Sequence, residues 1–127
     1  MGAALVGVLT WAGVALCGAL GAVARFRLDS TISARLPSDF PAGTLAVNLT
    51  GSFLLGVLVG ASASHRLALL LGVGFMGGYT TFSTWTVESE RLGEVGALVS
   101  LLANLLVSML VGLGVAAAGF YLGRAVA

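Results

Sequence analysis

The chain has 127 residues, of which 58% are hydrophobic and 9% are charged. This composition excludes an ordinary soluble domain and is typical of an integral membrane protein. A net charge of +1 gives no basic surface for nucleic acid, and the single cysteine, Cys17, excludes an intramolecular disulfide.

Charged residues divide the chain into four uncharged runs, at residues 1–24, 41–64, 67–87 and 95–123. Each run is long enough to form a helix across the hydrocarbon core of a bilayer, which takes about 20 residues. We therefore predict an all-α membrane protein with four transmembrane helices in one domain, residues 1–127. No basic residues precede the first run, so we do not expect a cleaved signal peptide.

Short connections are expected between the spans: an interfacial segment at residues 25–40, a tight turn at His65 and Arg66, and a charged turn at residues 88–94. Arg25 directly follows the first span. Its guanidinium group could draw anions into a vestibule, or it could simply extend to the lipid headgroups, as basic side chains near helix ends commonly do.

Small residues recur at intervals of four in three of the spans, and this spacing predicts close packing between membrane helices. They are Ser52, Gly56 and Gly60 in the second span, Gly74 and Gly78 in the third, and Gly119 and Gly123 in the fourth. Asn48 extends the first series, but an amide inside a span must find hydrogen-bond partners. The sequence leaves open whether Asn48 bonds a neighbouring helix or lines a polar path.

The third span is interrupted at residues 77–84, which read Gly-Gly-Tyr-Thr-Thr-Phe-Ser-Thr. Glycine loosens a helix backbone, and Ser and Thr offer it competing hydrogen bonds. We therefore predict that the third helix is broken. Non-helical backbone at membrane depth survives only when it is buried in protein or faces water, so the break points to a site for an ion or substrate.

Aromatic residues in the third span are spaced by four, three and three, at Phe75, Tyr79, Phe82 and Trp85. On a continuous helix they would form one stripe, which is ordinarily a packing surface. The edge of an aromatic ring is electropositive, however, and ring edges beside hydroxyl groups also suit a small anion. Both interpretations stay open from the sequence.

The fourth span carries Ser100, Asn104 and Ser108, again four residues apart, either as packing hydrogen bonds or as a track of donors. No span contains Asp, Glu or Lys. This disfavours a proton-coupled exporter, because proton coupling usually requires a titratable residue within the membrane. Neither a nucleophile with its base, a metal-ligand cluster nor a phosphate loop is visible, so we do not expect an enzyme.

The arginines encode orientation only weakly. Four of them, Arg25, Arg27, Arg35 and Arg91, fall on one side of the membrane, and Arg66 and Arg124 fall on the other. So small a bias is compatible with insertion in both orientations, although an ordinary single topology remains the alternative. Four packed helices also leave little room for a pathway. A conducting protein of this size therefore needs more than one subunit.

Four segments resemble the Fluc (CrcB) family of fluoride channels, in order and over essentially the whole chain. They are Gly-Ala-Leu-Gly-Ala-Val-Ala-Arg-Phe at residues 18–26, Gly-Thr-Leu-Ala-Val-Asn-Leu-Thr-Gly-Ser-Phe-Leu-Leu-Gly at 43–56, Gly-Phe-Met-Gly-Gly-Tyr-Thr-Thr-Phe-Ser-Thr at 74–84, and Asn-Leu-Leu-Val-Ser at 104–108. The segment in the third span is the most specific of the four.

The resemblance implies a passive fluoride channel of the bacterial inner membrane. It implies an antiparallel, dual-topology homodimer with two pores and a central structural sodium ion, held here by the backbone carbonyls of Gly77 and Thr80. The pore amide would be Asn48, and the pore aromatics Phe82 and Trp85. The family usually has Phe at the last position, so Trp85→Phe is predicted to be tolerated.

Further contacts to fluoride are implied by position for the hydroxyl groups of Thr81, Ser83, Thr84 and Ser108, with Arg25 at the entrance. Two other functions remain possible from the sequence. One is a proton- or sodium-coupled small exporter, and the other is a structural membrane subunit that transports nothing.

Overall fold

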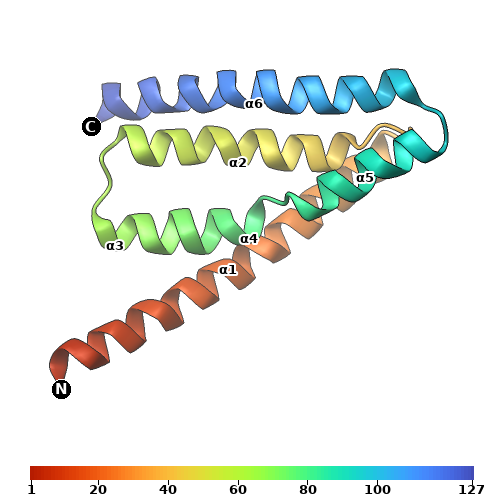
Figure 1. Cartoon of the computed structure of the whole chain (residues 1–127). Helices are drawn as coiled ribbons and strands as arrows, with labels where there is room; N and C mark the ends of the chain where they lie inside the picture. The colour runs from red at the N-terminus through yellow and green to blue at the C-terminus, as the bar shows by residue number, and fades with distance from the viewer.

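The computed structural model describes residues 1–127, and it is helical almost throughout (Figure 1). In chain order the elements are α1 (Gly2–Arg35), α2 (Ala42–Gly60), α3 (His65–Leu67), the π-helix η1 (Ala68–Met76), α4 (Gly77–Tyr79), α5 (Ser83–Glu94) and α6 (Leu98–Val126).

Four helical segments are long and apolar enough to cross a membrane: Gly2–Arg35, Ala42–Gly60, His65–Glu94 and Leu98–Val126. This confirms the prediction of an all-helical, multi-pass membrane protein. The third segment consists of α3, η1, α4 and α5, and it bends between α4 and α5, where residues 80–82 are not helical. The broken third helix is thus confirmed as well.

The connections differ from those predicted by a few residues. Helix α1 continues to Arg35, so most of the expected interfacial segment at residues 25–40 is helical. The tight turn lies at residues 61–64, before His65 and Arg66, because the Ser64 side chain caps α3 by accepting a hydrogen bond from the Leu67 N–H.

The charged segment at residues 88–94 is also helical, and it forms the second half of α5. The chain turns after it, at residues 95–97, where Gly96 takes the left-handed conformation with φ of +75°. Glycine adopts this conformation at little cost and commonly ends helices. Charges are no obstacle to a helix near the membrane surface, so they marked the end of the apolar run and not the end of the helix.

Helices α2 and α6 lie side by side along most of their length (Figure 1). Glycines make this approach possible: a Cβ atom on Gly56 or Gly60 would meet the backbone of Ala116 or Phe120, and one on Gly119 would meet that of Phe53. Helix α1 crosses the third span in the same way, where a Cβ on Gly78 would meet the Gly18 backbone. The close packing predicted from the four-residue spacing is confirmed.

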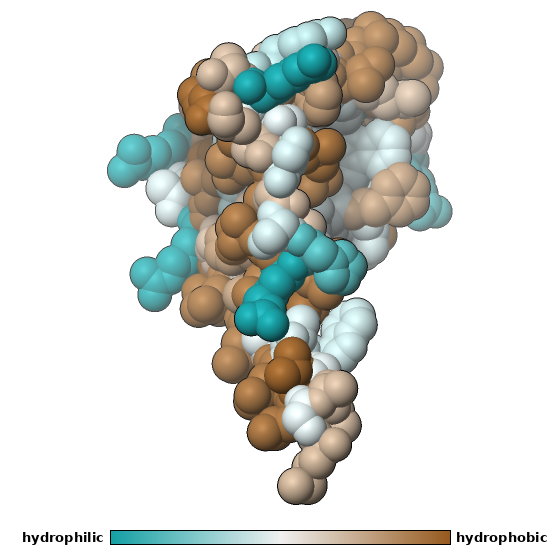
Figure 2. Space-filling model, turned by 90° about the vertical axis from the view of Figure 1, so that its left-hand side faces the viewer, coloured by the Kyte–Doolittle hydropathy of each residue, from teal (hydrophilic) through white to brown (hydrophobic).

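Little of the chain is enclosed by its own fold. Only 14 of the 127 residues are buried, and the largest fully buried side chains are Val47 and Asn104. Figure 2, seen from the end that carries α3 and the C-terminus, shows hydrophobic side chains over much of the surface with hydrophilic ones scattered among them. Most apolar surface is therefore left for lipid or for another protein chain.

Candidate ion site at the break in the third span

The break begins where α4 ends. Thr80 has an extended backbone, with φ of −81° and ψ of 158°, and α5 starts again at Ser83. The preceding turns belong to η1, a π-helix of nine residues. Such helices are rare and frequently occur at functional sites. The Gly-Gly and hydroxyl-rich sequence thus yields a real interruption of the span.

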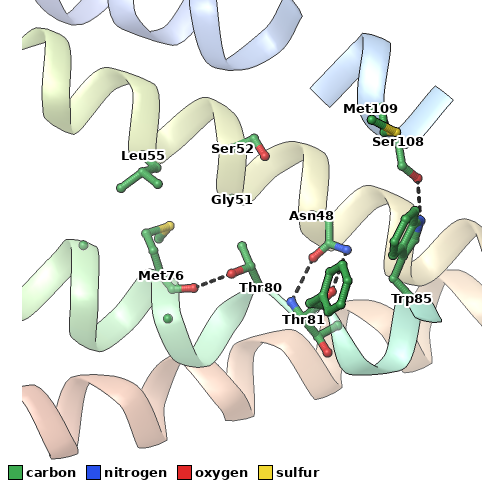
Figure 3. A pocket seen from close by; sticks show the side chains of 13 residues that line it. Asn48, Gly51, Ser52, Leu55, Met76, Thr80, Thr81, Trp85, Ser108 and Met109 are labelled. Atoms are coloured by element: carbon green, nitrogen blue, oxygen red, sulfur yellow. Dashed lines mark hydrogen bonds between the residues drawn. The ribbon is translucent and has the colours of Figure 1, made fainter. Parts of the chain in front are cut away.

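Asn48 holds the free backbone at this point. Its Nδ2 donates to the Thr81 carbonyl and its Oδ1 accepts from the Thr81 N–H, both at 2.9 Å (Figure 3). One of the two roles considered for Asn48, a hydrogen bond to a neighbouring span, is therefore present. It does not consume the whole amide, because Nδ2 carries two protons and only one of them has a protein partner.

Two carbonyls at the break lose their regular helical donors. In a continuous helix, the Thr81 N–H would bond to the Gly77 carbonyl, and the Thr84 N–H to the Thr80 carbonyl. Here the Thr81 N–H goes to Asn48, and the Thr84 N–H goes to the Thr81 Oγ1 at 3.2 Å. The carbonyl oxygens of Gly77 and Thr80 are left free to accept from, or coordinate, something else.

An open groove of about 490 Å³ lies along the break, and we call it the break groove (Figure 3). Helix α2 contributes Asn48 and α6 contributes Ser108. The third span contributes Gly77, Thr80, Thr81, Phe82 and Trp85. Most of the predicted site residues therefore converge here: Asn48, Gly77, Thr80, Thr81, Phe82, Trp85 and Ser108. No carboxylate lines the groove.

The aromatic stripe divides at the break. Phe75 and Tyr79 stack with ring centroids 5.9 Å apart, and Tyr79 is buried, with its hydroxyl 2.7 Å from Thr50 Oγ1. These two rings belong to the packed interior. Phe82 and Trp85 lie beyond the break and line the groove, with centroids 5.4 Å apart and ring planes at 41°. The single stripe that a continuous helix would give is not formed, because the backbone between Tyr79 and Phe82 is not helical.

Trp85 also makes a polar contact across the groove. Its indole Nε1 donates to the Ser108 Oγ at 3.1 Å and so connects α5 to α6. One turn later in α5 and one turn earlier in α6, the Asn104 Nδ2 donates to the Ser89 Oγ at 3.0 Å. The polar series predicted in the fourth span is therefore partly packing, at Asn104, and partly groove lining, at Ser108.

A second, smaller pocket of about 220 Å³ lies beside the break, and we call it the Arg25 pocket. It is lined by Arg25, Phe26, Asp29, Thr44, Val47, Thr81 and Thr84. Thr81 lines both cavities and therefore lies between them. Arg25 and Asp29 line this pocket together, so the carboxylate offsets the charge of the guanidinium group; the entrance role of Arg25 stays a prediction.

Ser83 is the predicted site residue that neither cavity includes. Its side chain is exposed in the single chain and lies on the first turn of α5. Sequence reasoning in turn missed Ser52 and Met109 as lining residues of the break groove. Ser52 could have been found, because it lies four residues after Asn48 and therefore on the same face of α2. Met109 carried no such signal.

A comparison with known protein families shows which family the chain belongs to. The family described as CrcB-like protein, Camphor Resistance (CrcB), matches residues 12–120. The chain belongs to the CrcB family. This confirms the resemblance found in the sequence motifs.

Several similar proteins of the family are named as ion channels. "Fluoride-specific ion channel FluC 2" of Mycobacterium tuberculosis (strain H37Rv) is 49% identical over 117 residues, which cover 92% of this chain and 93% of the relative. "Fluoride-specific ion channel FluC 1" of Leifsonia xyli is 44% identical, over 87% of this chain and 83% of the relative. "Fluoride-specific ion channel FluC" of Syntrophotalea carbinolica is 41% identical, over 87% and 94%. A family of ion channels also confirms that the chain is not an enzyme.

Proposed function

We propose that this chain forms a passive fluoride channel that exports fluoride across the bacterial inner membrane. The observation that carries the proposal is the break groove, which brings unpaired hydrogen-bond donors from Asn48 and Ser108 together with the rings of Phe82 and Trp85 and has no carboxylate in its lining. Such a lining favours an anion over a cation. The relatives named as fluoride-specific channels supply the identity of that anion.

Fluoride is small and strongly hydrated, so a pathway must replace its water with other donors. Asn48 offers an amide proton that has no protein partner, and the groove hydroxyls of Ser52 and Ser108 donate to no protein atom. The electropositive edges of Phe82 and Trp85 complete the lining. Thr81 and Thr84 would extend the route into the Arg25 pocket, and Ser83 would contribute from the exposed turn beside them.

We further propose an antiparallel, dual-topology homodimer with two pores. The break groove is open on one side, and Phe82 is 76% exposed although it lies in the middle of the third span. The unpaired backbone carbonyls beside Phe82 need partners that lipid does not offer, because lipid tails form no hydrogen bonds. A second copy in the opposite orientation would supply a partner surface, and the weak arginine bias permits it.

A structural sodium ion between the two copies is the remaining part of the proposal. The free carbonyls of Gly77 and Thr80 suit it, because small hard cations prefer oxygen ligands, and two copies would supply four such oxygens. When bound, the ion would add a full positive charge near both pores without a titratable side chain. Replacing sodium by N-methylglucamine should abolish transport, and full transport after exhaustive sodium removal would exclude a required ion.

The function is tested by fluoride efflux from liposomes that contain the purified protein. A passive channel dissipates a fluoride gradient when the proton gradient is abolished by an ionophore, and sodium gradients alter neither rate nor direction. The empty liposome and a chloride gradient are the controls. Efflux that requires a proton or sodium gradient would support an exporter, and no efflux under any gradient would support a subunit without transport.

The proton-coupled exporter has one observation in its favour. Glu88 lies on α5, not in the turn predicted for it, and its Oε1 accepts a hydrogen bond from the Thr44 hydroxyl at 3.1 Å while its buried Oε2 has no partner. A carboxyl group in this position could carry protons. Glu88→Gln keeps the side-chain shape but cannot titrate. A channel should keep its passive flux in this variant, whereas a proton-coupled exporter should lose transport.

A further inference from the structure

We infer that Trp85 is a positioning residue, which fixes the Ser108 hydroxyl as a hydrogen-bond donor to an anion in the break groove. The inference rests on the proposed fluoride function and deepens it. It assigns Trp85 a role through its N–H group, which a phenylalanine at the same position could not perform.

The direction of the hydrogen bond carries the first step. Trp85 Nε1 lies 3.1 Å from Ser108 Oγ, and an indole N–H can only donate. The serine oxygen must therefore accept. A hydroxyl group has one proton and two lone pairs, so this bond occupies a lone pair and leaves the proton for another partner.

The second step is that no protein group takes this proton. Hydroxyl groups inside helices of this chain commonly donate to the carbonyl four residues earlier, as Thr10, Thr31, Thr50, Thr86 and Ser89 do. Ser108 lies well inside α6 but makes no such bond to Asn104, and it lines the break groove. Its proton is available to a ligand in the groove.

Polarisation is the third step. A hydroxyl oxygen that accepts a hydrogen bond becomes a stronger donor, because chains of hydrogen bonds polarise one another. An anion facing Ser108 would end the chain that begins at the Trp85 N–H. Phenylalanine would leave the serine free to rotate and to donate back to its own helix, as Thr10, Thr86 and Ser89 do.

Trp85 is connected to a second polar contact between α5 and α6. Its backbone carbonyl accepts from the Ser89 Oγ at 2.8 Å, and Ser89 Oγ in turn accepts from Asn104. Asn104 is fully buried, with 0% of its surface exposed. The residue pairs 85 with 108 and 89 with 104 therefore fix how α5 and α6 face each other, and so where the indole N–H points.

The hydrogen bond is tested by NMR of the ¹⁵N-labelled protein. The chain has two tryptophans, and Trp11, which lies on α1, is 61% exposed and does not line the groove, serves as an internal reference. Ser108→Ala should move the Trp85 indole proton signal upfield and leave that of Trp11 in place. Fluoride should move the Trp85 signal in the wild type but not in Ser108→Ala, and chloride should move neither.

Flux measurements test the role in transport. Trp85→Phe keeps a ring but loses the N–H group, so we expect fluoride efflux to fall about three- to tenfold, as one lost hydrogen bond implies. The double variant Trp85→Phe/Ser108→Ala should be no slower than Ser108→Ala alone. The matched control is Ser52→Ala, which removes a groove hydroxyl that Trp85 does not contact. Its effect should add to that of Trp85→Phe.

Three results would overturn the inference: wild-type flux in Trp85→Phe, additive effects of Trp85→Phe and Ser108→Ala, or an indole signal that Ser108→Ala leaves unmoved. The first is what the family resemblance alone predicts, so the two expectations are directly opposed. A wild-type protein that carries no fluoride while Ser108→Ala still moves the indole signal would refute the fluoride function and not the hydrogen bond.

Discussion

Asn48 combines two tasks at the break. Its side chain bonds both the backbone N–H and the backbone carbonyl of Thr81, at 2.9 Å each, and still leaves one amide proton for the groove. Because the first task leaves the Gly77 carbonyl without its helical donor, the same side chain contributes to both the free oxygens and the free donor of the break groove.

This double role predicts how variants of Asn48 behave. Asn48→Ala loses both bonds to Thr81 and the groove proton, so fluoride efflux should fall at least about tenfold. Asn48→Asp can still accept from the Thr81 N–H, but it places a negative charge beside the anion and should be slower still. Efflux from liposomes measures both, and size-exclusion chromatography reports whether assembly survives. Unchanged efflux in Asn48→Asp would exclude an anion path past this residue.

Phe82 provides a second test at this scale. Phe82→Ile keeps an apolar side chain of similar bulk but removes the electropositive ring edge, so efflux should drop strongly while the protein remains folded. Circular dichroism in detergent provides the folding control. Wild-type efflux would show that the ring edge has no part in conduction.

At the residue scale, the sequence predicted what was chemically unusual. Asn48, the hydroxyl cluster and the aromatics stood out because they lie within apolar spans. The hydrogen bond between Trp85 and Ser108 could not be predicted from the sequence, because the two residues are 23 positions apart and their contact depends on how α5 and α6 pack. Ser83 resembles its neighbours in type, but it is exposed on the first turn of α5 and lines neither cavity.

At the scale of elements, the molecule depends on glycine-mediated helix contacts around one interrupted span. Helices α2 and α6 approach until their backbones nearly touch, and α1 does the same against η1 and α4. The interruption is then stabilised by side chains, namely Asn48 from α2 and Thr81, which caps the restarted helix. Rigid contacts on either side hold a break that hydrocarbon alone would not tolerate.

Two glycines of α6 test the packing. Gly119→Ala places a methyl group against the Phe53 backbone, whereas Gly114→Ala meets nothing within 4 Å. We expect Gly119→Ala to destabilise the protein by about 1–3 kcal/mol, as overpacking does, and Gly114→Ala to have little effect. Thermal unfolding in detergent compares them. Equal melting temperatures for the two variants would contradict the close α2–α6 contact.

Element boundaries were less predictable than elements. Four spans and the position of the break followed from apolar runs and from the Gly-Gly sequence. The ends of α1 and α5 did not, because hydropathy marks where a chain leaves the hydrocarbon and hydrogen bonding decides where a helix stops. The π-helical form of η1 had no sequence signal that we can identify.

At the scale of the whole molecule, a single chain leaves much of its own apolar surface uncovered. Few of its residues are buried, the break groove is open, and Phe82 is exposed beside it. The antiparallel homodimer that we propose would cover this surface and would bring two copies of the Gly77 and Thr80 carbonyls together. From the sequence, the small size of the chain indicated more than one subunit, and the weak arginine bias permitted two orientations. The sequence could not indicate which surfaces of two copies would meet, because that depends on the folded shape of both.

The antiparallel arrangement is tested by forcing the orientation. Several Lys residues added at one end of the chain should fix a single topology and abolish fluoride efflux, because no oppositely oriented partner is then present. Co-expression with a version that carries the added charges at the other end should restore it. Efflux from a preparation with one verified orientation would rule out an obligatory antiparallel dimer.

The reversal potential of the purified protein in a planar lipid bilayer tests passive fluoride conduction most directly. With a fluoride gradient and symmetrical pH, sodium and chloride, we predict a current that reverses at the equilibrium potential of fluoride. Imposing a pH, sodium or chloride gradient at symmetrical fluoride should leave the reversal at zero. A reversal potential that follows protons, sodium or chloride, or the absence of any current, would contradict the assignment.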